Sequence, residues 1–265
     1  MNKDLKEKFA FTLAEGATHV GIFHNTRRVG FTLAEVLITL GIIGIVSAMT
    51  IPTLIKNYQE KVRDNQFKKA YATLNQALRL TTSEFGYQPK CYAFSPSDND
   101  SDNKVISECK IFYETLVKNL KVVKHCPNKA FEGGCIPHYD GFEVILKEQH
   151  KNDEDYDEEY WDKKVNNTKW WRTEHLKNTV PAYVLSDGSI LIPYGNGTSF
   201  NAIFLLDING FSGPNKFNHD VFEFILYLDN SRYIILGGAS MGVIKGGIMT
   251  QNLIEKLFGT YEIYY

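Results

Sequence analysis

The chain has 265 residues, 43% of them hydrophobic and 13% aromatic, and its formal net charge is −2. A chain of this length can bury a sizeable core in one domain. A charge close to zero does not indicate a globally basic, nucleic-acid-binding protein. The composition therefore predicts an ordered protein and argues against a strongly basic protein that binds nucleic acid.

The first long element is an apolar segment at residues 31–55, which contains one ionisable side chain, that of Glu35. As a helix, its 25 residues would rise about 1.5 Å each and cross a hydrocarbon core of about 30 Å. Five basic and three acidic residues precede it, which favours a cytoplasmic N-terminal side. We predict a single membrane span with the rest of the chain exported; a buried helix of a soluble protein is the alternative.

The junction at residues 30–55 reads G-FTLAEVLITLGIIGIVSAMTIPTLI, with a glycine directly before the apolar run. It closely resembles the N-terminus of type IV pilins and of the pseudopilins of type II secretion systems. In that family a membrane-embedded prepilin peptidase cuts after the glycine and methylates the new N-terminal amine. The resemblance maps Gly30 to the residue before the cut, Phe31 to the methylated first residue and Glu35 to the glutamate near the start of the mature chain. Residues 1–30 are then the leader, including the earlier FTLAE copy at residues 11–15.

Glu35 also makes physical sense in this role. An ionised carboxylate near a bilayer centre costs about 2.5–3.5 kcal/mol, so it requires a partner. Cleavage after Gly30 creates a positive amine at Phe31, four residues away on the same helical face. The resemblance implies that Glu35 of one subunit pairs with Phe31 of its neighbour in a filament. Alternatively, Glu35 lies in the headgroup zone, which suits the unassembled subunit.

Gly41, Gly44 and Pro52 mark the part of this helix that we expect to kink or unwind. Proline removes one backbone donor and crowds the carbonyl four residues earlier, while each glycine lowers helix propensity by about 1 kcal/mol relative to alanine. An ordinary kink of a membrane helix is the alternative to local melting in a filament.

Residues 56–86 predict an amphipathic continuation of the same helix, ending at Gly86. Its apolar side chains recur at the i, i+3, i+4 spacing of one helical face, namely Phe67, Ala70, Tyr71, Leu74, Ala77 and Leu78. Residues 87–265 form the exported globular head. We expect a helix at 106–120 and strands within 141–146, 182–194, 200–210, 220–228 and 231–238, separated by hairpin signals. The predicted fold class is α+β and pilin-like: a long N-terminal helix, whose first half spans the membrane, packed against an antiparallel sheet.

Four cysteines lie beyond the span, an even number in a region predicted to be exported, which predicts two disulfides. Three pairings are possible. We expect neighbours in the sequence to pair because that closes short loops, giving Cys91–Cys109 and Cys126–Cys135. A zinc site is the competing interpretation, but the chain has no CxxC pair.

Two polar stretches are candidate binding sites in the head. Asp207, Asn209 and Asp220 supply oxygen atoms suited to calcium, although the EF-hand pattern is absent and a plain turn is the alternative. No other cofactor is required. The acidic run at 151–164 is either a surface for a partner or a solvated loop.

The motif Gly238-Ala239-Ser240-Met241-Gly242 matches GxSxG, but a hydrolase needs an acid and a histidine after the serine. No histidine follows His219, so we interpret the motif as a turn and the protein as no enzyme. The sequence thus predicts a pilin or pseudopilin subunit of the inner membrane and its filament, and its size favours a minor subunit or a pseudopilin. Its expected partners are prepilin peptidase, other subunits, the assembly platform and the bilayer. The rivals are a membrane-anchored module that captures a ligand or DNA, and a tethered serine hydrolase.

Overall fold

The computed structural model describes residues 30–93, 106–160, 163, 171–195, 200–229, 232–237 and 247–259. The chain divides into two compact units, Met1–Thr53 and Leu54–Tyr265. Helix α1 (Leu33–Phe85) supplies residues to both, so each unit is described by itself.

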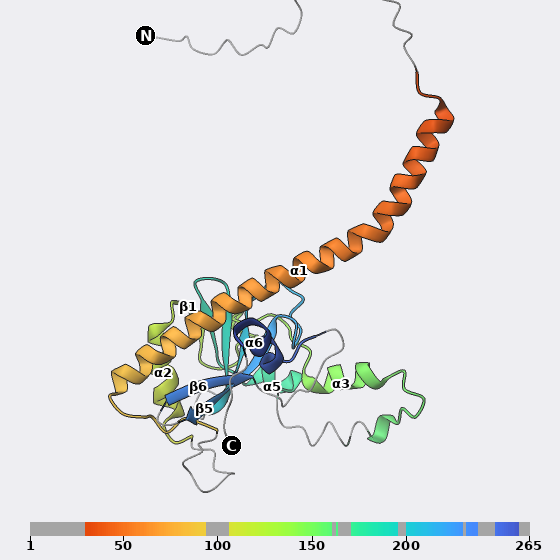
Figure 1. Ribbon diagram of the computed structural model, residues 1–265. Coiled ribbons are helices and arrows are strands. Elements are labelled where there is room, and N and C mark those ends of the chain that lie inside the picture. The colour runs from red at the N-terminus through yellow and green to blue at the C-terminus, as the bar shows by residue number, and fades with distance from the viewer. Residues whose placement is uncertain are drawn as a thin grey trace, which may run out of the picture. The chain divides into compact units, whose positions relative to one another are not determined.

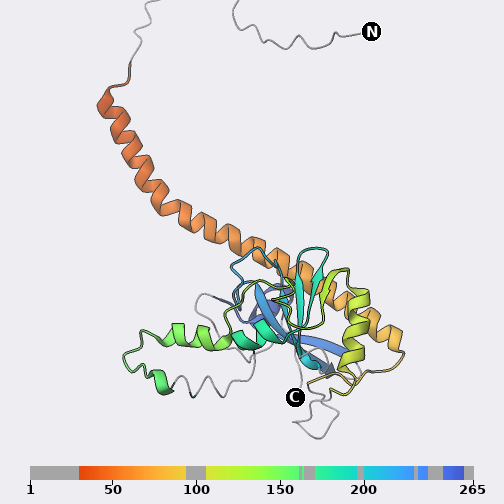
Figure 2. The ribbon, with the colours of Figure 1, turned by 180° about the vertical axis from the view of Figure 1, so that it is seen from behind.

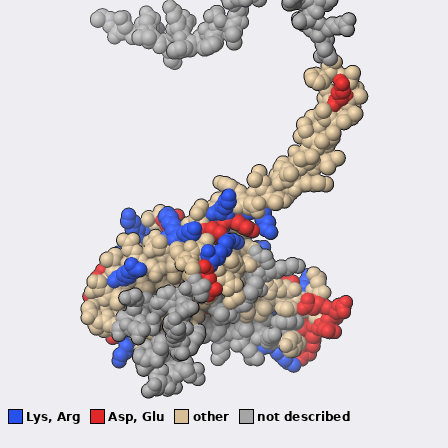
Figure 3. All heavy atoms as spheres, in the orientation of Figure 1, with Lys and Arg blue, Asp and Glu red and all other residues tan. Residues whose placement is uncertain are grey.

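In the first unit the described chain is almost entirely the start of α1. Its large apolar side chains are exposed all round the helix, from Phe31 to Ile51. Figure 3 shows this part of α1 as a nearly uninterrupted tan surface. Within α1 one segment is long and apolar enough to cross a membrane, and none of that segment is buried. An all-round apolar helix needs an apolar surrounding or partner.

In the second unit α1 is amphipathic, with one apolar face and one polar face. Its buried face consists of Phe67, Ala70, Leu74, Ala77, Leu78 and Thr81, and the partly buried Tyr71 packs beside them, which confirms the predicted apolar face. The helix ends at Phe85, and Gly86 takes a left-handed φ of 68° that suits a glycine.

One antiparallel sheet of six strands forms the centre of the second unit, with its strands in sequence order. The strands are β1 (Val122–Cys126), β2 (Ala182–Leu185), β3 (Ile190–Gly195), β4 (Phe200–Asp207), β5 (Val221–Asp229) and β6 (Arg232–Gly237). Strands β2 to β6 lie where the apolar runs predicted them. The α+β fold with a long N-terminal helix is therefore confirmed.

Both faces of the sheet are covered. On β4, Phe204 and Leu206 pack into the core shared with α1, whereas Leu205 lies in a second core on the opposite face. Successive side chains of a strand alternate between faces, so β4 and β5 read as continuous apolar runs. Helix α2 (Cys109–Asn119) and helix α6 (Thr250–Phe258) contribute to the core on the α1 face. Figure 2 shows α2 beside the last turns of α1, where the Asn119 amide donates to Thr81 Oγ1 at 3.2 Å.

The opposite face is covered by residues 130–142 together with two short helices, α3 (Phe142–His150) and α5 (Thr173–Asn178). The prediction of a strand at 141–146 was therefore wrong. Gly141 N donates to Thr173 Oγ1 and Thr173 N donates to Glu143 Oε1, so the start of α3 is tied to the start of α5. The sequence GFEVIL has apolar residues suited to either structure, and these contacts between distant segments select the helix.

Two disulfides link Cys91 to Cys109 and Cys126 to Cys135, the pairing of sequence neighbours that we predicted. The first bond attaches the segment after α1 to the start of α2 within the main core. The second attaches the end of β1 to the loop that follows it. Strand β1 itself was not predicted, because only two apolar residues begin its VVKHC sequence.

Candidate processing and assembly segment

The structure begins the description of the candidate cleavage site at Gly30, which is exposed. A Cβ built on Gly30 would meet no atom of the described residues within 4 Å, and the same holds for Gly41 and Gly44. Phe31 next to Gly30 is 85% exposed. The peptide bond between Gly30 and Phe31 is thus free of tertiary contacts with the described residues, as a protease substrate requires.

Thr32 and Glu35 form a capping box at the N-terminus of α1. Glu35 N donates to Thr32 Oγ1 at 3.2 Å, and Thr32 N donates to Glu35 Oε2 at 2.8 Å. The Thr32 hydroxyl donates to the same carboxylate oxygen at 2.9 Å. These bonds satisfy backbone donors that a helix start otherwise leaves unpaired. The role of Thr32 was not predicted, although the spacing Thr-x-x-Glu before an apolar run is the signal for it.

The carboxylate of Glu35 therefore has a local partner in the single chain. All its hydrogen bonds within the described part of the chain go to Oε2, so Oε1 is left for another donor. Glu35 is also the only ionisable residue of the apolar segment 31–55. A cationic group from outside the chain would find one carboxylate oxygen already oriented by the helix start and one available.

Gly41, Gly44 and Pro52 all lie inside α1, which the structure assigns as helix from Leu33 to Phe85. Pro52 leaves the carbonyl of Ala48 without its helical backbone donor. The Thr50 hydroxyl donates to a different carbonyl, that of Val46, at 2.9 Å. Unwinding of Gly41–Pro52 within a filament remains a prediction.

The comparison with protein families gives two matches. The prokaryotic N-terminal methylation motif matches residues 27–51, the stretch that contains Gly30, Phe31, the capping box and the exposed apolar turns. The chain carries the N-terminal signature of type IV pilins and pseudopilins. Residues 53–170 match a family of unknown function (DUF6613), which covers the rest of α1 and the first part of the head. No curated protein and no solved structure matches the chain.

This signature indicates a pilin-like or pseudopilin subunit, anchored in a membrane through its apolar helix. The family that carries this motif is structural, and the signature implies processing by prepilin peptidase and assembly with other pilin subunits. Ser240 and the remainder of the GxSxG motif lie outside the described residues.

In the pilin-like head, the residues expected to bind calcium form a network of hydrogen bonds at the β4–β5 loop. Asp207 Oδ1 accepts from Asn209 N at 3.1 Å and from Gly210 N at 2.6 Å, and Asp207 Oδ2 accepts from the Tyr139 hydroxyl at 2.6 Å. Asp220 accepts from Asn215 N at 2.8 Å and from Lys216 N at 2.7 Å. In the described part of the chain, no group of three or more His, Cys, Asp or Glu side chains is placed to hold a metal ion.

Burial dominates the electrostatics of this network. Desolvation raises the pKa of Asp207 from 3.8 to about 7, the hydrogen bond from Tyr139 opposes the shift, and the charge of Asp220 adds to it. Burial also raises the pKa of Tyr139 well above its ordinary value. Gly210, with a φ of 59°, lets the loop pass so close to the carbonyl of Gly188 that a Cβ would clash. Through the hydrogen bond from Gly210 N, Asp207 therefore holds the β4–β5 loop close to the β2–β3 turn.

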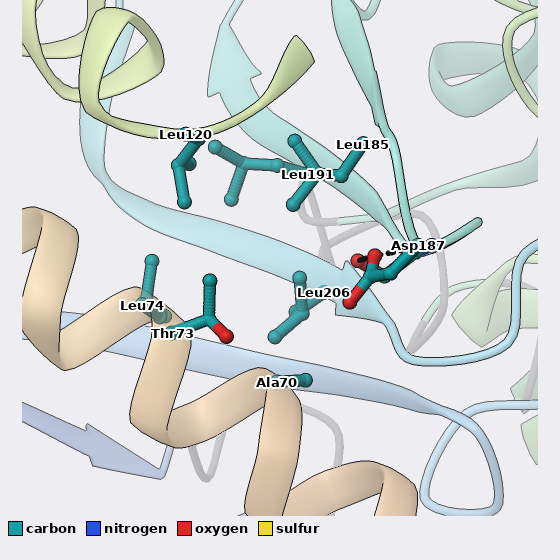
Figure 4. A pocket seen from close by; sticks show the side chains of 9 residues that line it. Ala70, Thr73, Leu74, Leu120, Leu185, Asp187, Leu191 and Leu206 are labelled. Atoms are coloured by element: carbon teal, nitrogen blue, oxygen red, sulfur yellow. Dashed lines mark hydrogen bonds between the residues drawn. The ribbon is translucent and has the colours of Figure 1, made fainter. Parts of the chain in front are cut away.

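A small cavity lies between α1 and the β2–β3 turn (Figure 4). Leucines from β2, β3, β4 and the end of α2 line it, together with Thr73 of α1 and Asp187 of the turn. Its volume of about 10 Å³ is at most that of a single water molecule. Asp187 accepts from the Ser189 hydroxyl at 2.6 Å and pairs with Lys69 at 3.3 Å, so the turn is attached to α1. This cavity therefore has no room for a substrate.

The acidic run is described at residues 151–160 and at Lys163. Its acidic side chains form the red patch that Figure 3 shows beyond α3. Asp153 pairs with His150 at 2.6 Å and Glu159 pairs with Lys163 at 2.8 Å, both between exposed groups of neighbouring turns. Such local surface pairs do not distinguish a partner surface from a solvated loop.

Proposed function

We propose that this chain is a structural subunit of a type IV pilus or of a type II secretion pseudopilus. Prepilin peptidase cleaves after Gly30 and methylates the amine of Phe31. The observation that carries the proposal is the order of features along the chain: an exposed Gly30–Phe31 bond, a Thr32–Glu35 capping box, and an exposed apolar helix. Each feature is expected of a cleaved, membrane-inserted assembly helix, and together they match the methylation motif at 27–51.

Assembly follows from what cleavage does to the charges. The new amine at Phe31 is positive, and Glu35 of a neighbouring subunit offers a carboxylate that costs free energy to keep unpaired in an apolar surrounding. Pairing of these two groups fixes the axial register, while the apolar turns of α1 supply the contact area. Gly41 and Gly44 permit close approach of neighbouring helices, because small residues bring helix backbones together.

The subunit first resides in the inner, cytoplasmic membrane as a single-pass protein with its head exported, in contact with the assembly platform. Both disulfides support an exported head, because disulfides persist in oxidising compartments. Removal of 30 of the 265 residues leaves a mature chain of 235 residues. That size favours a minor pilin or a pseudopilin over a major pilin.

The test is the identity of the mature N-terminus. Mass spectrometry of the protein isolated from its native membrane should find a chain that begins with N-methylated Phe31. A membrane-anchored module for capturing ligand or DNA, the first rival, predicts an intact Gly30–Phe31 bond and a head outside any filament. The second rival, a tethered hydrolase, predicts that a fluorophosphonate probe labels Ser240, and the absence of labelling would remove it.

A further inference from the structure

A groove in the second unit runs between α1 and the β4–β5 loop. Its volume is about 710 Å³, and ligand sites commonly have about 300–1,000 Å³. The α1 wall includes Lys56, Gln59, Glu60 and Arg63, and the loop wall includes Asn209 and His219. The α1 residues recur every three or four positions, so they belong to one face of the helix.

The groove carries charges of both signs. Neither Lys56 nor Glu60 forms an ion pair with any residue that the structure describes. The guanidinium of Arg63 contacts Asp64 through one Nη atom at 3.3 Å. Asp220 also lines the groove, but its two oxygens accept backbone hydrogen bonds from the loop. The acidic group left to meet a ligand is therefore Glu60.

The position along the chain indicates where the ligand comes from. Lys56 follows directly on the apolar segment 31–55, and α1 rises about 1.5 Å per residue. The headgroup regions add about 10–15 Å to the total thickness of a bilayer, so the first turns after a span lie at headgroup level. This step rests on the membrane span of the proposed function, but not on cleavage or on filament assembly.

We propose that the groove binds the headgroup of a zwitterionic phospholipid that carries a phosphate and a primary ammonium. The phosphate meets the ammonium of Lys56 and the guanidinium of Arg63, and the primary ammonium donates to the carboxylate of Glu60. An anionic headgroup without an amine would leave Glu60 without a counter-charge, and a quaternary amine has no N–H to donate to Glu60.

The experiment uses the full-length protein in vesicles that contain equal amounts of phosphatidylethanolamine, phosphatidylglycerol and phosphatidylcholine. After extraction in a mild detergent, native mass spectrometry identifies the lipid that stays bound. We expect an adduct with the mass of intact phosphatidylethanolamine, reduced about tenfold by Lys56→Gln or by Arg63→Gln, the effect of losing one interaction of about 1.4 kcal/mol. Lys56 is exposed, so we expect its replacement to leave the fold intact.

Lys61→Gln is the matched control. Lys61 is an exposed cation on the same helix, but it does not line the groove. Equal loss in this variant, or equal retention of phosphatidylglycerol, would show a general attraction of cations to lipid and overturn the proposal. An adduct of free phosphoethanolamine mass, or no adduct, would overturn it as well. The mature N-terminus measured on the same samples reports on the proposed function separately.

Discussion

Thr32 and Glu35 hold each other at the first turn of α1 through two reciprocal hydrogen bonds between side chain and backbone and one between their side chains. The residue proposed to fix assembly is thus also the residue that starts the helix. These two roles make different demands, because the cap requires an acceptor, whereas the pairing with the Phe31 amine requires a charge.

Substitutions at these two positions separate the roles. Glu35→Gln keeps an acceptor for the cap but removes the charge, so we expect a processed, inserted subunit that enters filaments poorly, as for Glu35→Ala. Thr32→Ala removes the hydroxyl and keeps the charge, so it should cost helix stability of about 0.5–2 kcal/mol and leave incorporation intact. Co-purification of each variant with filaments measures the effect. Normal incorporation of Glu35→Gln would contradict the proposal that a charge pair between Glu35 and the Phe31 amine sets the axial register of the filament.

Substitutions at Gly30 test the cleavage step. Gly30→Arg places a long cation before the scissile bond, and we expect the leader to remain attached and give a heavier band on a denaturing gel. Gly30→Ala is the matched control, because a Cβ at Gly30 meets no described atom within 4 Å. Any difference between the two variants then reports on the peptidase and not on folding of the chain. Efficient cleavage of Gly30→Arg would argue against the assignment.

The disulfides predict a measurable share of head stability. Closing a loop of about 15 residues stabilises a protein by about 3 kcal/mol in the chain-entropy description. The two loops here have sequence separations of 18 and 9 residues. Reduction of both bonds should therefore lower the free energy of unfolding by several kcal/mol. Denaturant titration of the full chain in detergent, with and without dithiothreitol, measures the change. Cys91→Ala with Cys109→Ala should reproduce the part due to the Cys91–Cys109 bond.

The raised pKa of Asp207 predicts how stability depends on pH. The folded chain keeps the Asp207 proton up to about pH 7, whereas an unperturbed aspartate loses it near 3.8. Between these values the folded state binds more protons than the unfolded state, so the Asp207 contribution to stability falls as pH rises. The slope is at most about 1.4 kcal/mol per pH unit. Thermal melts of wild type and Asp207→Asn between pH 4 and 7 should show a flatter dependence in the variant.

Asp187→Asn is the control for that series. Partial burial opposes ionisation of Asp187, but hydrogen bonds from Ser189 and the contact with Lys69 leave its pKa below 3.8. Its titration therefore lies under the tested range, and this variant should keep the wild-type slope. A wild-type slope in Asp207→Asn would assign the pH dependence to another group.

The same melts examine calcium. Because the oxygens of Asp207 and Asp220 accept hydrogen bonds from the loop and from Tyr139, we expect the same melting temperature in EDTA and in calcium. If calcium instead raises the melting temperature of the wild type, and both Asp207→Asn and Asp220→Asn abolish this increase, the calcium site is established.

The local features of this protein could be read from its sequence. Gly30, the apolar run and Glu35 need no tertiary contact to be recognised, since membrane insertion and cleavage act on a continuous segment. The paired cysteines are close in sequence, and the strands β2 to β6 are strongly apolar runs between turn residues. The amphipathic face from Phe67 to Leu78 follows from helical periodicity alone.

Other features depend on contacts between segments far apart in the chain. GFEVIL becomes the start of α3 because Gly141 and Glu143 bond to Thr173, about 30 positions away. Weakly apolar β1 becomes a strand because β2 supplies its hydrogen-bond partner. Asp207 has a shifted pKa only because Tyr139 and the sheet bury it, and the groove exists only because the β4–β5 loop lies near α1. The sequence by itself determined what each segment can do in water or lipid, and tertiary structure decided which polar groups lost their water and which partners replaced it.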